Sequence, residues 1–211
     1  MGYNPYDPAD HEFQDGTKPD MRRIWWWTVL LLVVGGLPAG PALAGPSLAL
    51  SAQEATMQIH SSAFADEGII PRQYTCEGKD LSPPLRWEGI PAGTQSLALI
   101  VEDPDAPDPA APQRIWVHWI VYDIPPHIQE LSAGVQRFPP GAREGINDWQ
   151  RRGYGGPCPP IGRHRYFFRL YALDTALPAL QSPDKNSLQA AMRGHVLAEA
   201  TLMGRYAKGD R

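Results

Sequence analysis

The fold is decided by the stretch Arg114-Ile115-Trp116-Val117-His118-Trp119-Ile120-Val121-Tyr122-Asp123-Ile124. β-Branched and aromatic side chains dominate it, and such residues favour a pleated strand that is at least half buried. Alternate residues of a strand lie on the same face of a sheet. One face is therefore expected to carry Trp116, His118, Ile120 and Tyr122, and the other Ile115, Val117, Trp119 and Val121. The stretch predicts a long strand with one histidine in apolar surroundings.

Further strands are expected on both sides of this one. The runs 96–101 and 165–173 are apolar or aromatic, and 58–60 and 85–87 are shorter candidates. Between them lie loops rich in proline, at 103–112 and 125–162. The chain holds 23 prolines and 20 glycines, residues that interrupt helices and central strands and so argue against a helical bundle. We predict a mainly β domain built as a sandwich or a barrel-like pair of sheets.

One late helix is expected between residues 183 and 203. Its apolar positions recur at helical spacing rather than alternating. These positions are Leu188, Ala191, Met192, His195, Ala198 and Leu202. Asn186 or Ser187 is the expected N-cap, and Gly204 is the expected end of the helix.

The N-terminus has the pattern of a secretory signal peptide. Met21-Arg22-Arg23 precedes an apolar run at 24–34, and a tail of small residues ends in Ala42-Leu43-Ala44. We therefore expect translation to start at Met21, cleavage after Ala44, a flexible leader at 45–56 and the domain at 57–211. The mature protein would be periplasmic or extracellular. The alternative is an uncleaved membrane anchor at 24–43, although glycines and prolines interrupt the second half of that segment.

Charge and cysteine content narrow the possibilities further. The formal net charge is −4 and the pI is about 5.8, so broad nucleic-acid binding is not expected. The two cysteines, Cys76 and Cys158, both fall in the predicted mature part. An exported protein encounters oxidising conditions, and an even count predicts one disulfide. The alternative is a pair of buried free thiols.

Three segments place polar residues beside apolar strands. Asp103-Pro104-Asp105-Ala106-Pro107 follows the run 96–101, His118 interrupts the central stretch, and a glycine- and proline-rich loop at 154–162 leads into His164 and Tyr166. Each segment has an ordinary structural explanation when it is taken alone. The first is then a solvated turn, the second a hydrogen-bonded core histidine, and the third a turn with a histidine at the start of a strand.

Taken together, the three segments suit a pocket for an anion. Imidazole N–H, phenol O–H and backbone N–H groups can all donate to a phosphate-like oxygen. Asp103 is out of place in such a pocket, because a carboxylate repels an anion. We therefore expect Asp103 to orient a histidine and raise its pKa, or to share a proton with the ligand.

The motifs resemble those of the phosphatidylethanolamine-binding protein family, in its bacterial Raf-kinase-inhibitor-like branch. The matching stretches, in order, are Tyr74-Thr75-Cys76-Glu77-Gly78, Ser82-Pro83-Pro84-Leu85-Arg86-Trp87, Asp103-Pro104-Asp105-Ala106-Pro107, Trp116-Val117-His118-Trp119, Gly156-Pro157-Cys158-Pro159-Pro160 and Gly162-Arg163-His164-Arg165-Tyr166. The resemblance implies an antiparallel β-sandwich with a C-terminal helix and a small cavity for phosphate or phospholipid head groups. The pocket positions that it implies are Asp103, Pro107, Trp116, His118, Gly156, Pro157, His164 and Tyr166.

Three classes of function remain to be compared. We expect a non-enzymatic exported protein that binds a small anion, with no cofactor, no metal ion and no nucleic acid as partner. It would meet the membrane only through an uncleaved N-terminal segment. The alternative is a regulator that binds a protein partner, such as a kinase or protease inhibitor. A hydrolase is less expected, because the predicted mature part contains neither a Gly-x-Ser-x-Gly elbow nor a His-Glu-x-x-His motif.

Overall fold

The computed structural model describes residues 56–210, which form two antiparallel β-sheets. The five-stranded sheet has the order β6-β4-β3-β7-β8, and the three-stranded sheet has the order β1-β2-β5. The elements are β1 Gln58–His60, η1 Arg72–Tyr74, β2 Leu85–Glu88, β3 Ser96–Ala106, β4 Arg114–Ile124, β5 Glu130–Leu131, β6 Arg143–Glu144, β7 His164–Leu173, α1 Lys185–Met192 and β8 Val196–Tyr206. The predicted mainly β class is confirmed, and the five expected strands are found, four of them within one residue of the expected bounds and β3 five residues longer.

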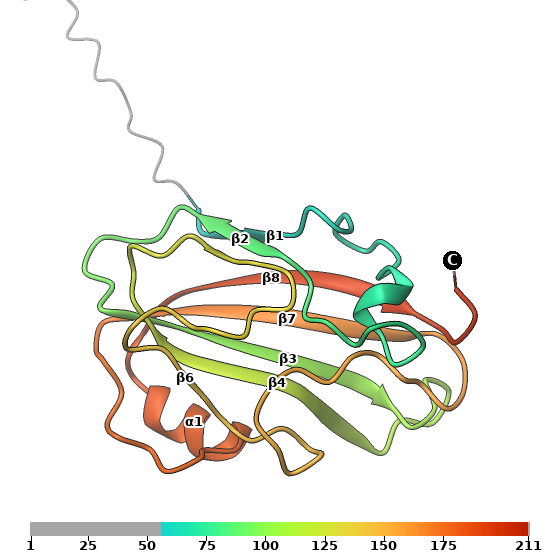
Figure 1. The fold of residues 1–211 in the computed structure, drawn as a ribbon. Helices are drawn as coiled ribbons and strands as arrows, with labels where there is room; N and C mark the ends of the chain where they lie inside the picture. The colour runs from blue at the N-terminus through green and yellow to red at the C-terminus, as the bar shows by residue number, and fades with distance from the viewer. Residues whose placement is uncertain (1–55, 211) are drawn as a thin grey trace, which may run out of the picture. The chain divides into compact units, whose positions relative to one another are not determined.

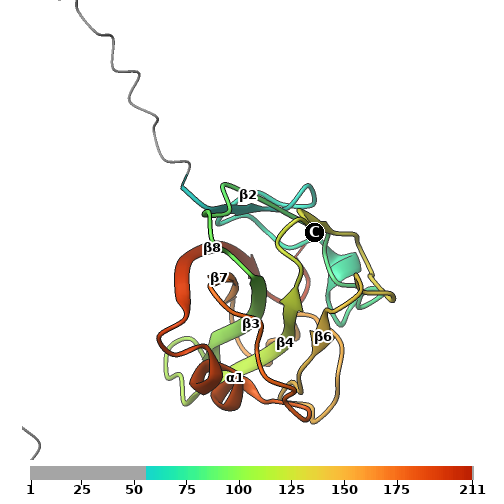
Figure 2. The same ribbon diagram turned by 90° about the vertical axis from the view of Figure 1, so that its left-hand side faces the viewer.

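The main core lies between the two sheets. In Figure 1 β1 and β2 lie above the long strands, and α1 lies below them; Figure 2 shows the same three layers after a turn of 90°. The core between the sheets includes Ile59, Trp87, Leu99, Val101, Trp119, Phe168 and Leu202. Trp87 is fully buried, and its indole N–H donates to the carbonyl of Ile128 over 2.8 Å. Burying large apolar side chains on this scale is the main favourable contribution to folding.

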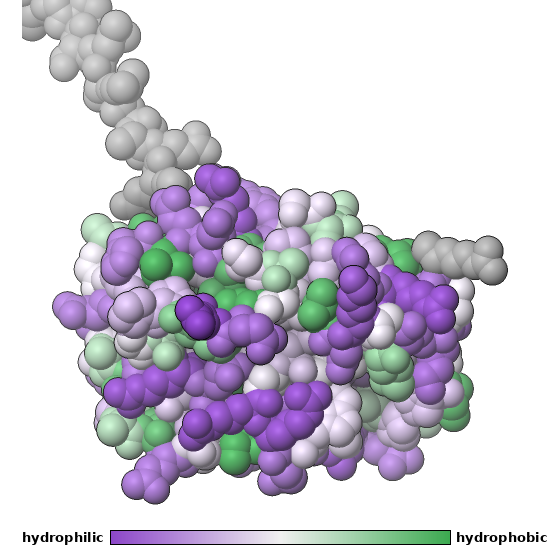
Figure 3. Space-filling model, in the orientation of Figure 1, coloured by the Kyte–Doolittle hydropathy of each residue, from purple (hydrophilic) through white to green (hydrophobic). Residues whose placement is uncertain are grey.

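A second, smaller core lies on the other face of the five-stranded sheet. There α1 packs Leu188 and Met192 against the strand residues Ile100, Ile120 and Tyr122. Asp184 caps this helix, since its carboxylate accepts the N–H of Ser187 over 2.8 Å. The expected caps Asn186 and Ser187 are therefore wrong by two or three residues. On the face shown in Figure 3 the surface is mostly polar, and apolar side chains form small separate areas.

The second half of the predicted late helix is wrong, because it forms the strand β8. The helix ends at Met192, and Gly194 turns the chain with a φ of +83°. From Val196 onward the chain pairs with β7 along its whole length, from Leu173 opposite Val196 to His164 opposite Tyr206. His195, Ala198 and Leu202 therefore lie outside the helix. Pairing with a neighbouring strand is a tertiary interaction that a local helical spacing does not reveal.

Strand β3 is longer than the run 96–101 predicts. It continues to Ala106, so the segment that starts at Asp103 lies in the sheet and not in a solvated turn. Asp103 and Asp105 are each only 4% exposed. The peptide bond between Ala106 and Pro107 is cis. The backbone at Asp103 and Asp105 is therefore fixed by strand pairing as well as by the neighbouring prolines.

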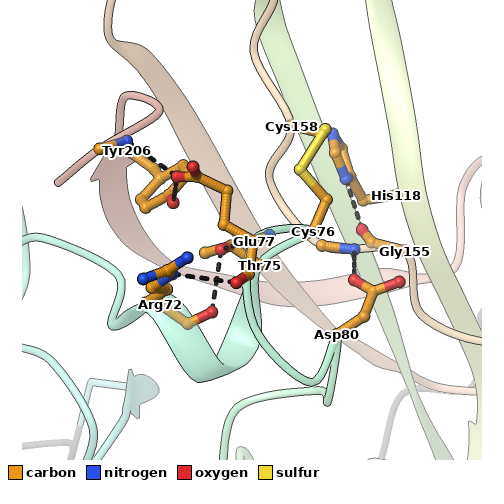
Figure 4. The surroundings of a disulfide bond; sticks show 11 residues. Arg72, Thr75, Cys76, Glu77, Asp80, His118, Gly155, Cys158 and Tyr206 are labelled. Atoms are coloured by element: carbon orange, nitrogen blue, oxygen red, sulfur yellow. Dashed lines mark hydrogen bonds between the residues drawn. A yellow bond between two sulfur atoms is a disulfide. The ribbon is translucent and has the colours of Figure 1, made fainter. Parts of the chain in front are cut away.

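The two cysteines form the predicted disulfide. Cys76 and Cys158 are 82 residues apart in the chain, and their bond joins the segment after η1 to the loop before β7 (Figure 4). The signal peptide and almost all of the predicted leader lie outside the described residues. Among residues 56–210, no helix is long and apolar enough to cross a membrane.

Candidate anion-binding site

A β-bulge in β4 sets the direction of His118. Val101 of β3 pairs with Trp119, and the next residue, Glu102, pairs with Val117, so His118 is one extra residue on β4. Such a bulge rotates the strand and re-aims a side chain. Val117 and Ile120 consequently lie on the same face, in the core under α1. The simple alternation expected for 115–122 is therefore wrong at this point.

The side chain of His118 is buried and held from three sides. Its Nδ1 lies 2.6 Å from the carbonyl oxygen of Gly155 and, because a carbonyl only accepts, Nδ1 carries the proton. Its ring meets the rings of Trp149 and Tyr166 edge to face, with centroids 5.1 and 5.2 Å apart. Burial lowers the pKa of His118 to about 4, although the hydrogen bond to Gly155 opposes this shift. Nε2 therefore holds a free electron pair at neutral pH.

Asp103 and His164 form a buried pair. Oδ2 of Asp103 lies 2.7 Å from Nδ1 of His164, while Oδ1 accepts the backbone N–H of Asp105 over 2.8 Å. Nε2 of His164 lies 3.0 Å from the carbonyl of Ile161 and donates to it. Burial raises the pKa of Asp103, and the hydrogen bond to His164 acts against that rise. The expectation that Asp103 orients a histidine is confirmed.

One proton joins the carboxylate and the imidazole of this pair. The contact holds either a carboxylate with an imidazolium or a carboxylic acid with a neutral imidazole, and the total charge is zero in both forms. Both nitrogens of His164 and both oxygens of Asp103 already have partners. The pair therefore shapes the site and adds no net charge to it.

Two buried donors next to these groups have no partner. The hydroxyl of Tyr166 and the indole Nε1 of Trp116 lack a hydrogen-bond partner among the described residues. The ring of Tyr166 lies 5.2 Å from that of His118 and 6.4 Å from that of His164. Burial is the main cause that raises the pKa of Tyr166, so its hydroxyl keeps its proton. A buried donor without a partner is costly and calls for an explanation.

A cavity of about 300 Å³ opens in front of these groups. It is lined by Asp103, Ala106, Pro107, Trp116, His118, Trp149, Cys158, Pro159, Pro160 and His164. Two larger surface hollows, one beside β2 and one beside the start of α1, contain none of the predicted site residues. The smaller cavity is the stronger candidate, because it alone of these three is lined by Trp116 and by the two histidines that lie next to Tyr166.

Five of the eight predicted site residues line this cavity. They are Asp103, Pro107, Trp116, His118 and His164. Tyr166 lies behind the two histidines instead, and it shares the buried face of β7 with His164 and Phe168 as the alternation predicts. Gly156 and Pro157 are buried outside the lining. The structure thus brings most of the set together, while ligand binding by these residues stays a prediction.

Gly156 and Pro157 fix the loop that forms one wall. The N–H of Gly156 donates to Oδ1 of Asp80 over 2.6 Å, and the carbonyl of Pro157 accepts the N–H of Cys76 over 3.1 Å. A Cβ at Gly156 would lie 2.5 Å from the carbonyl oxygen of Tyr74, so only glycine fits there. Figure 4 shows Asp80, the disulfide and the hydrogen bond between His118 and Gly155 close together.

Sequence reasoning missed half of the lining. Ala106, Trp149, Cys158, Pro159 and Pro160 line the cavity without having been named as site residues. Trp149 lies in a turn in which the side-chain oxygen of Asn147 accepts backbone N–H groups, including that of Trp149. Trp149 itself is 40% exposed. The sequence feature that could have identified Trp149 is a large aromatic residue in an otherwise polar turn. Among the described residues no group of three potential metal ligands comes together.

The charged residues beside the cavity are paired with one another. Arg165 binds the carboxylate of Asp105 through two nitrogens, at 2.9 and 2.7 Å. The guanidinium of Arg114 lies 4.2 Å from the ring centroid of Trp116 and 3.6 Å from the carboxylate of Asp148. Among the residues that line the cavity there is no lysine or arginine. The arrangement offers uncharged hydrogen-bond donors in a confined space.

Comparison with known proteins assigns the family. Residues 60–207 match the family described as phosphatidylethanolamine-binding protein. A UPF0098 protein of Methanothermobacter thermautotrophicus is 49% identical over 156 residues, which span 72% of this chain and 100% of the relative. A UPF0098 protein of Chlamydia muridarum is 47% identical over 150 residues, covering 71% of this chain and 98% of the relative.

Two crystal structures share the fold. One is a putative phosphatidylethanolamine-binding protein homologue, CT736 from Chlamydia trachomatis, with a TM-score of 0.68 and 44% identity over 73% of this chain and 99% of that one. The other is YbcL from E. coli, described as a member of the mammalian family, with a TM-score of 0.65 and 31% identity over 72% of this chain and 98% of that one. The fold, the motifs and these matches agree, and the chain belongs to the phosphatidylethanolamine-binding protein family.

Proposed function

We propose that the protein is an exported, non-enzymatic binding protein whose cavity takes a small oxyanion, such as phosphate or a phosphorylated head group. Membership of the family supports a binding protein. The observation that carries the finer proposal is the pair of buried donors without partners, Tyr166 O–H and Trp116 Nε1–H. Trp116 lines the cavity and Tyr166 lies beside it against the ring of His118, and hydrogen-bond donors of this kind are what an oxyanion requires.

Hydrolysis is supported less well by the same residues. Both cysteines are in the disulfide, and Asp103 and His164 are saturated by each other and by backbone groups. A nucleophile needs a base within hydrogen-bond reach that is free to take its proton. His118 is the one histidine of the cavity with a free nitrogen, and no serine or threonine lines the cavity beside it.

Calorimetry with inorganic phosphate and phosphoethanolamine tests the proposal. The variant Tyr166→Phe deletes the unpartnered hydroxyl, and we expect affinity to fall by roughly 10- to 100-fold, because a hydrogen bond to a charged group contributes about 1.5–3 kcal/mol. Stability in the absence of ligand should stay the same or rise, since a buried hydroxyl without a partner is removed. The matched control is Tyr122→Phe, whose hydroxyl donates to the carbonyl of Leu180 in the core under α1.

The control variant is expected to bind like the wild type. Equal affinity for the wild type and Tyr166→Phe would remove the hydroxyl from the site. Absence of binding to every phosphorylated probe, in protein that is folded by near-UV circular dichroism, would contradict the proposal itself.

A further inference from the structure

A further hollow lies between the segment after η1, the segment after β5 and the connection before β7. Its volume is about 460 Å³, and it is lined by Lys79, Asp80, Leu81, Ser82, Gly134, Gln136, Arg151, Arg152, Gly153 and Tyr154. It shares no lining residue with the anion cavity. We call it the basic hollow, because three of its lining side chains are cations and one is a carboxylate.

The three cations of the basic hollow have no counter-ion. Lys79, Arg151 and Arg152 are exposed, and none of them forms an ion pair with a carboxylate of residues 56–210. By contrast, the guanidinium groups of Arg165 and Arg169 are each paired with a carboxylate. Cations gathered in one concave surface repel one another and attract anions to it.

The one carboxylate of the lining already has a backbone partner. Oδ1 of Asp80 accepts the N–H of Gly156 over 2.6 Å (Figure 4). Three cations minus one carboxylate leave a local excess of two positive charges. The whole chain has a formal net charge of −4, so the excess is a property of this surface and not of the overall composition.

The turn that carries two of the arginines is fixed by a buried amide. Asn147 is 1% exposed; its Oδ1 accepts the N–H of Arg151 over 3.3 Å, and its Nδ2 donates to the carbonyl of Gly153 over 2.8 Å. Nη2 of Arg152 donates to the hydroxyl of Ser182 over 2.9 Å, which is a partner without charge. A binding surface that is already ordered loses less conformational entropy when a partner binds.

Apolar and aromatic side chains lie among these cations. Leu81 and Tyr154 line the basic hollow and also pack against the main core. Cζ of Arg151 lies 5.9 Å from the ring centroid of Trp149, which is 40% exposed. Tryptophan, tyrosine and arginine are the residues most enriched at hot spots of protein interfaces. The combination indicates a peptide segment as the occupant more than a bare inorganic ion.

We propose that the basic hollow binds a short acidic segment of a partner protein. The carboxylates of that segment lie against Lys79, Arg151 and Arg152, and an apolar side chain between them packs on Leu81 and Tyr154. Guanidinium groups suit this role, because their paired N–H groups match the two oxygens of a carboxylate. The proposal concerns a separate surface and does not rest on the oxyanion cavity.

The net charge of the chain favours a short segment over a long polyanion. A nucleic acid or an anionic membrane would extend beyond the basic hollow and meet the negative charge of the remaining surface. A segment of a few residues experiences mainly the local excess of positive charge. Screening by salt limits its interactions to roughly 8 Å at physiological ionic strength.

Two labelled peptides test the charge requirement. One has the sequence Glu-Glu-Leu-Glu-Glu, and its matched control Gln-Gln-Leu-Gln-Gln has the same length and shape without the charges. We expect the acidic peptide to bind at least about tenfold more tightly at low ionic strength, measured by fluorescence anisotropy, because hydrogen bonds to charged groups are the stronger ones. Added salt should weaken binding of the acidic peptide and leave the neutral peptide unchanged.

The double variant Arg151→Gln, Arg152→Gln locates the peptide on the domain. Both side chains are exposed and neither is in an ion pair, so the fold should be retained. We expect affinity for the acidic peptide to fall by about tenfold or more. The matched control is Arg193→Gln at the end of α1, an exposed arginine outside the hollow, and it should bind like the wild type.

A change in the peptide tests the apolar contact without altering the protein. Replacing the central leucine by glycine should weaken binding by about 3- to 10-fold, because the apolar area packed on Leu81 and Tyr154 is lost. Equal affinity of the leucine and glycine peptides would remove this contact from the proposal. The comparisons of peptides and salt on the wild type remain decisive even where a variant does not fold.

Phosphate binding separates this surface from the anion cavity. The variant Tyr166→Phe should leave affinity for the acidic peptide unchanged, and the double arginine variant should leave affinity for inorganic phosphate unchanged. Phosphate binding that is lost in the double arginine variant would assign the basic hollow to small inorganic anions and overturn the proposal. Failure of either site therefore shows in one measurement and not in the other.

The remaining outcomes also decide the matter. Selective, salt-sensitive binding of the acidic peptide that the double arginine variant loses and Arg193→Gln retains would support the inference. Absence of binding, equal binding of the acidic and neutral peptides, or acidic-peptide binding that persists in the double variant would overturn it. Binding of a short oligonucleotide or of phosphatidylglycerol vesicles that exceeds peptide binding and is lost in the double variant would replace the protein partner by a nucleic acid or a membrane.

Discussion

At the scale of single residues, the site depends on groups whose partners decide their protonation. Gly155 selects the tautomer of His118, and Asp103 and Ile161 occupy both nitrogens of His164. Two histidines that look equivalent in the sequence therefore have different roles. His118 offers an electron pair to the cavity, and His164 is a structural partner of Asp103.

The buried state of His118 predicts how stability changes with pH. Its pKa is about 4 in the folded protein and 6.5 in an unfolded chain, so the unfolded state takes up the proton first as pH falls. Its contribution is complete above pH 6.5 and is lost progressively toward pH 4. Between pH 7 and 5 we expect the free energy of unfolding to drop by roughly 2 kcal/mol from this residue alone.

Urea denaturation at the two pH values measures that drop. The variant His118→Gln should lose less stability than the wild type over the same interval, because glutamine does not titrate. Identical pH dependence in the two proteins would mean that His118 is not buried in its neutral form.

Some features of single residues could be predicted from the sequence and others could not. Asp103, His118 and His164 were expected in one site because three motifs contain them, and the strand alternation correctly placed His164 with Tyr166. The bulge at His118 depends on how Val101 and Glu102 of the neighbouring strand pair with β4, and a local sequence pattern does not reveal that pairing. Trp149 lines the cavity because hydrogen bonds to Asn147 stabilise the turn that carries it, and no periodic pattern in the sequence predicts such a turn.

At the scale of elements, the long strands β3, β4 and β7 were predictable, whereas the end of the helix and the long strand β8 were not. The strands β4 and β7 are rich in β-branched and aromatic residues, and β3 begins with an apolar run, so their local patterns agree with their tertiary roles. The segment after Met192 contains Ala198 and Ala200, which favour a helix locally. Its pairing with β7 across ten residue positions outweighs that preference.

The strand assignment of β8 makes a prediction at Gly204. A Cβ there would lie 2.5 Å from Cγ1 of Ile70 and 2.9 Å from Cε2 of Phe64. The variant Gly204→Ala should therefore lower the free energy of unfolding by about 1–3 kcal/mol through overpacking. Thr201→Ala, on an exposed position of the same strand, is the control and should change it by less than about 0.5 kcal/mol. Equal small effects at both positions would contradict the packing of β8 under Ile70.

The disulfide joins two loops that meet at the cavity wall. Because it closes a stretch of 82 residues, chain-entropy reasoning gives roughly 4–5 kcal/mol of stabilisation. We expect the double variant Cys76→Ser, Cys158→Ser to lose most of that amount in urea denaturation.

A reducing agent serves as the control for this measurement. Dithiothreitol should destabilise the wild type by a similar amount and leave the double variant unchanged. A wild type whose stability does not respond to complete reduction, shown by thiol titration, would argue that the bond adds little.

At the scale of the whole molecule, the sequence predicts export of a β-sandwich domain. The domain belongs to the phosphatidylethanolamine-binding protein family, and its disulfide fits an oxidising compartment. We expect the native protein to begin at Gly45, after cleavage behind Ala44. Intact mass and N-terminal sequencing of protein from the native host measure this directly. Recovery in the membrane fraction with the 24–43 segment retained would favour the anchor instead.

A protein partner is the alternative to a small ligand at this scale. Trp149 lines the cavity and is 40% exposed, and tryptophan is common at interface hot spots. Capture of one stoichiometric partner, abolished by Trp149→Ala but indifferent to Tyr166→Phe, would favour that alternative. If the partner and phosphate compete for binding, the protein partner and the small ligand use the same site.

A high-resolution crystal structure of the mature protein with methyl phosphate bound tests the central claim most directly. We predict a phosphoryl group in the cavity, with oxygens within hydrogen-bond distance of Trp116 Nε1, the Tyr166 hydroxyl and His118 Nε2. A ligand bound elsewhere, with both donors still lacking partners in an empty cavity, would contradict the claim.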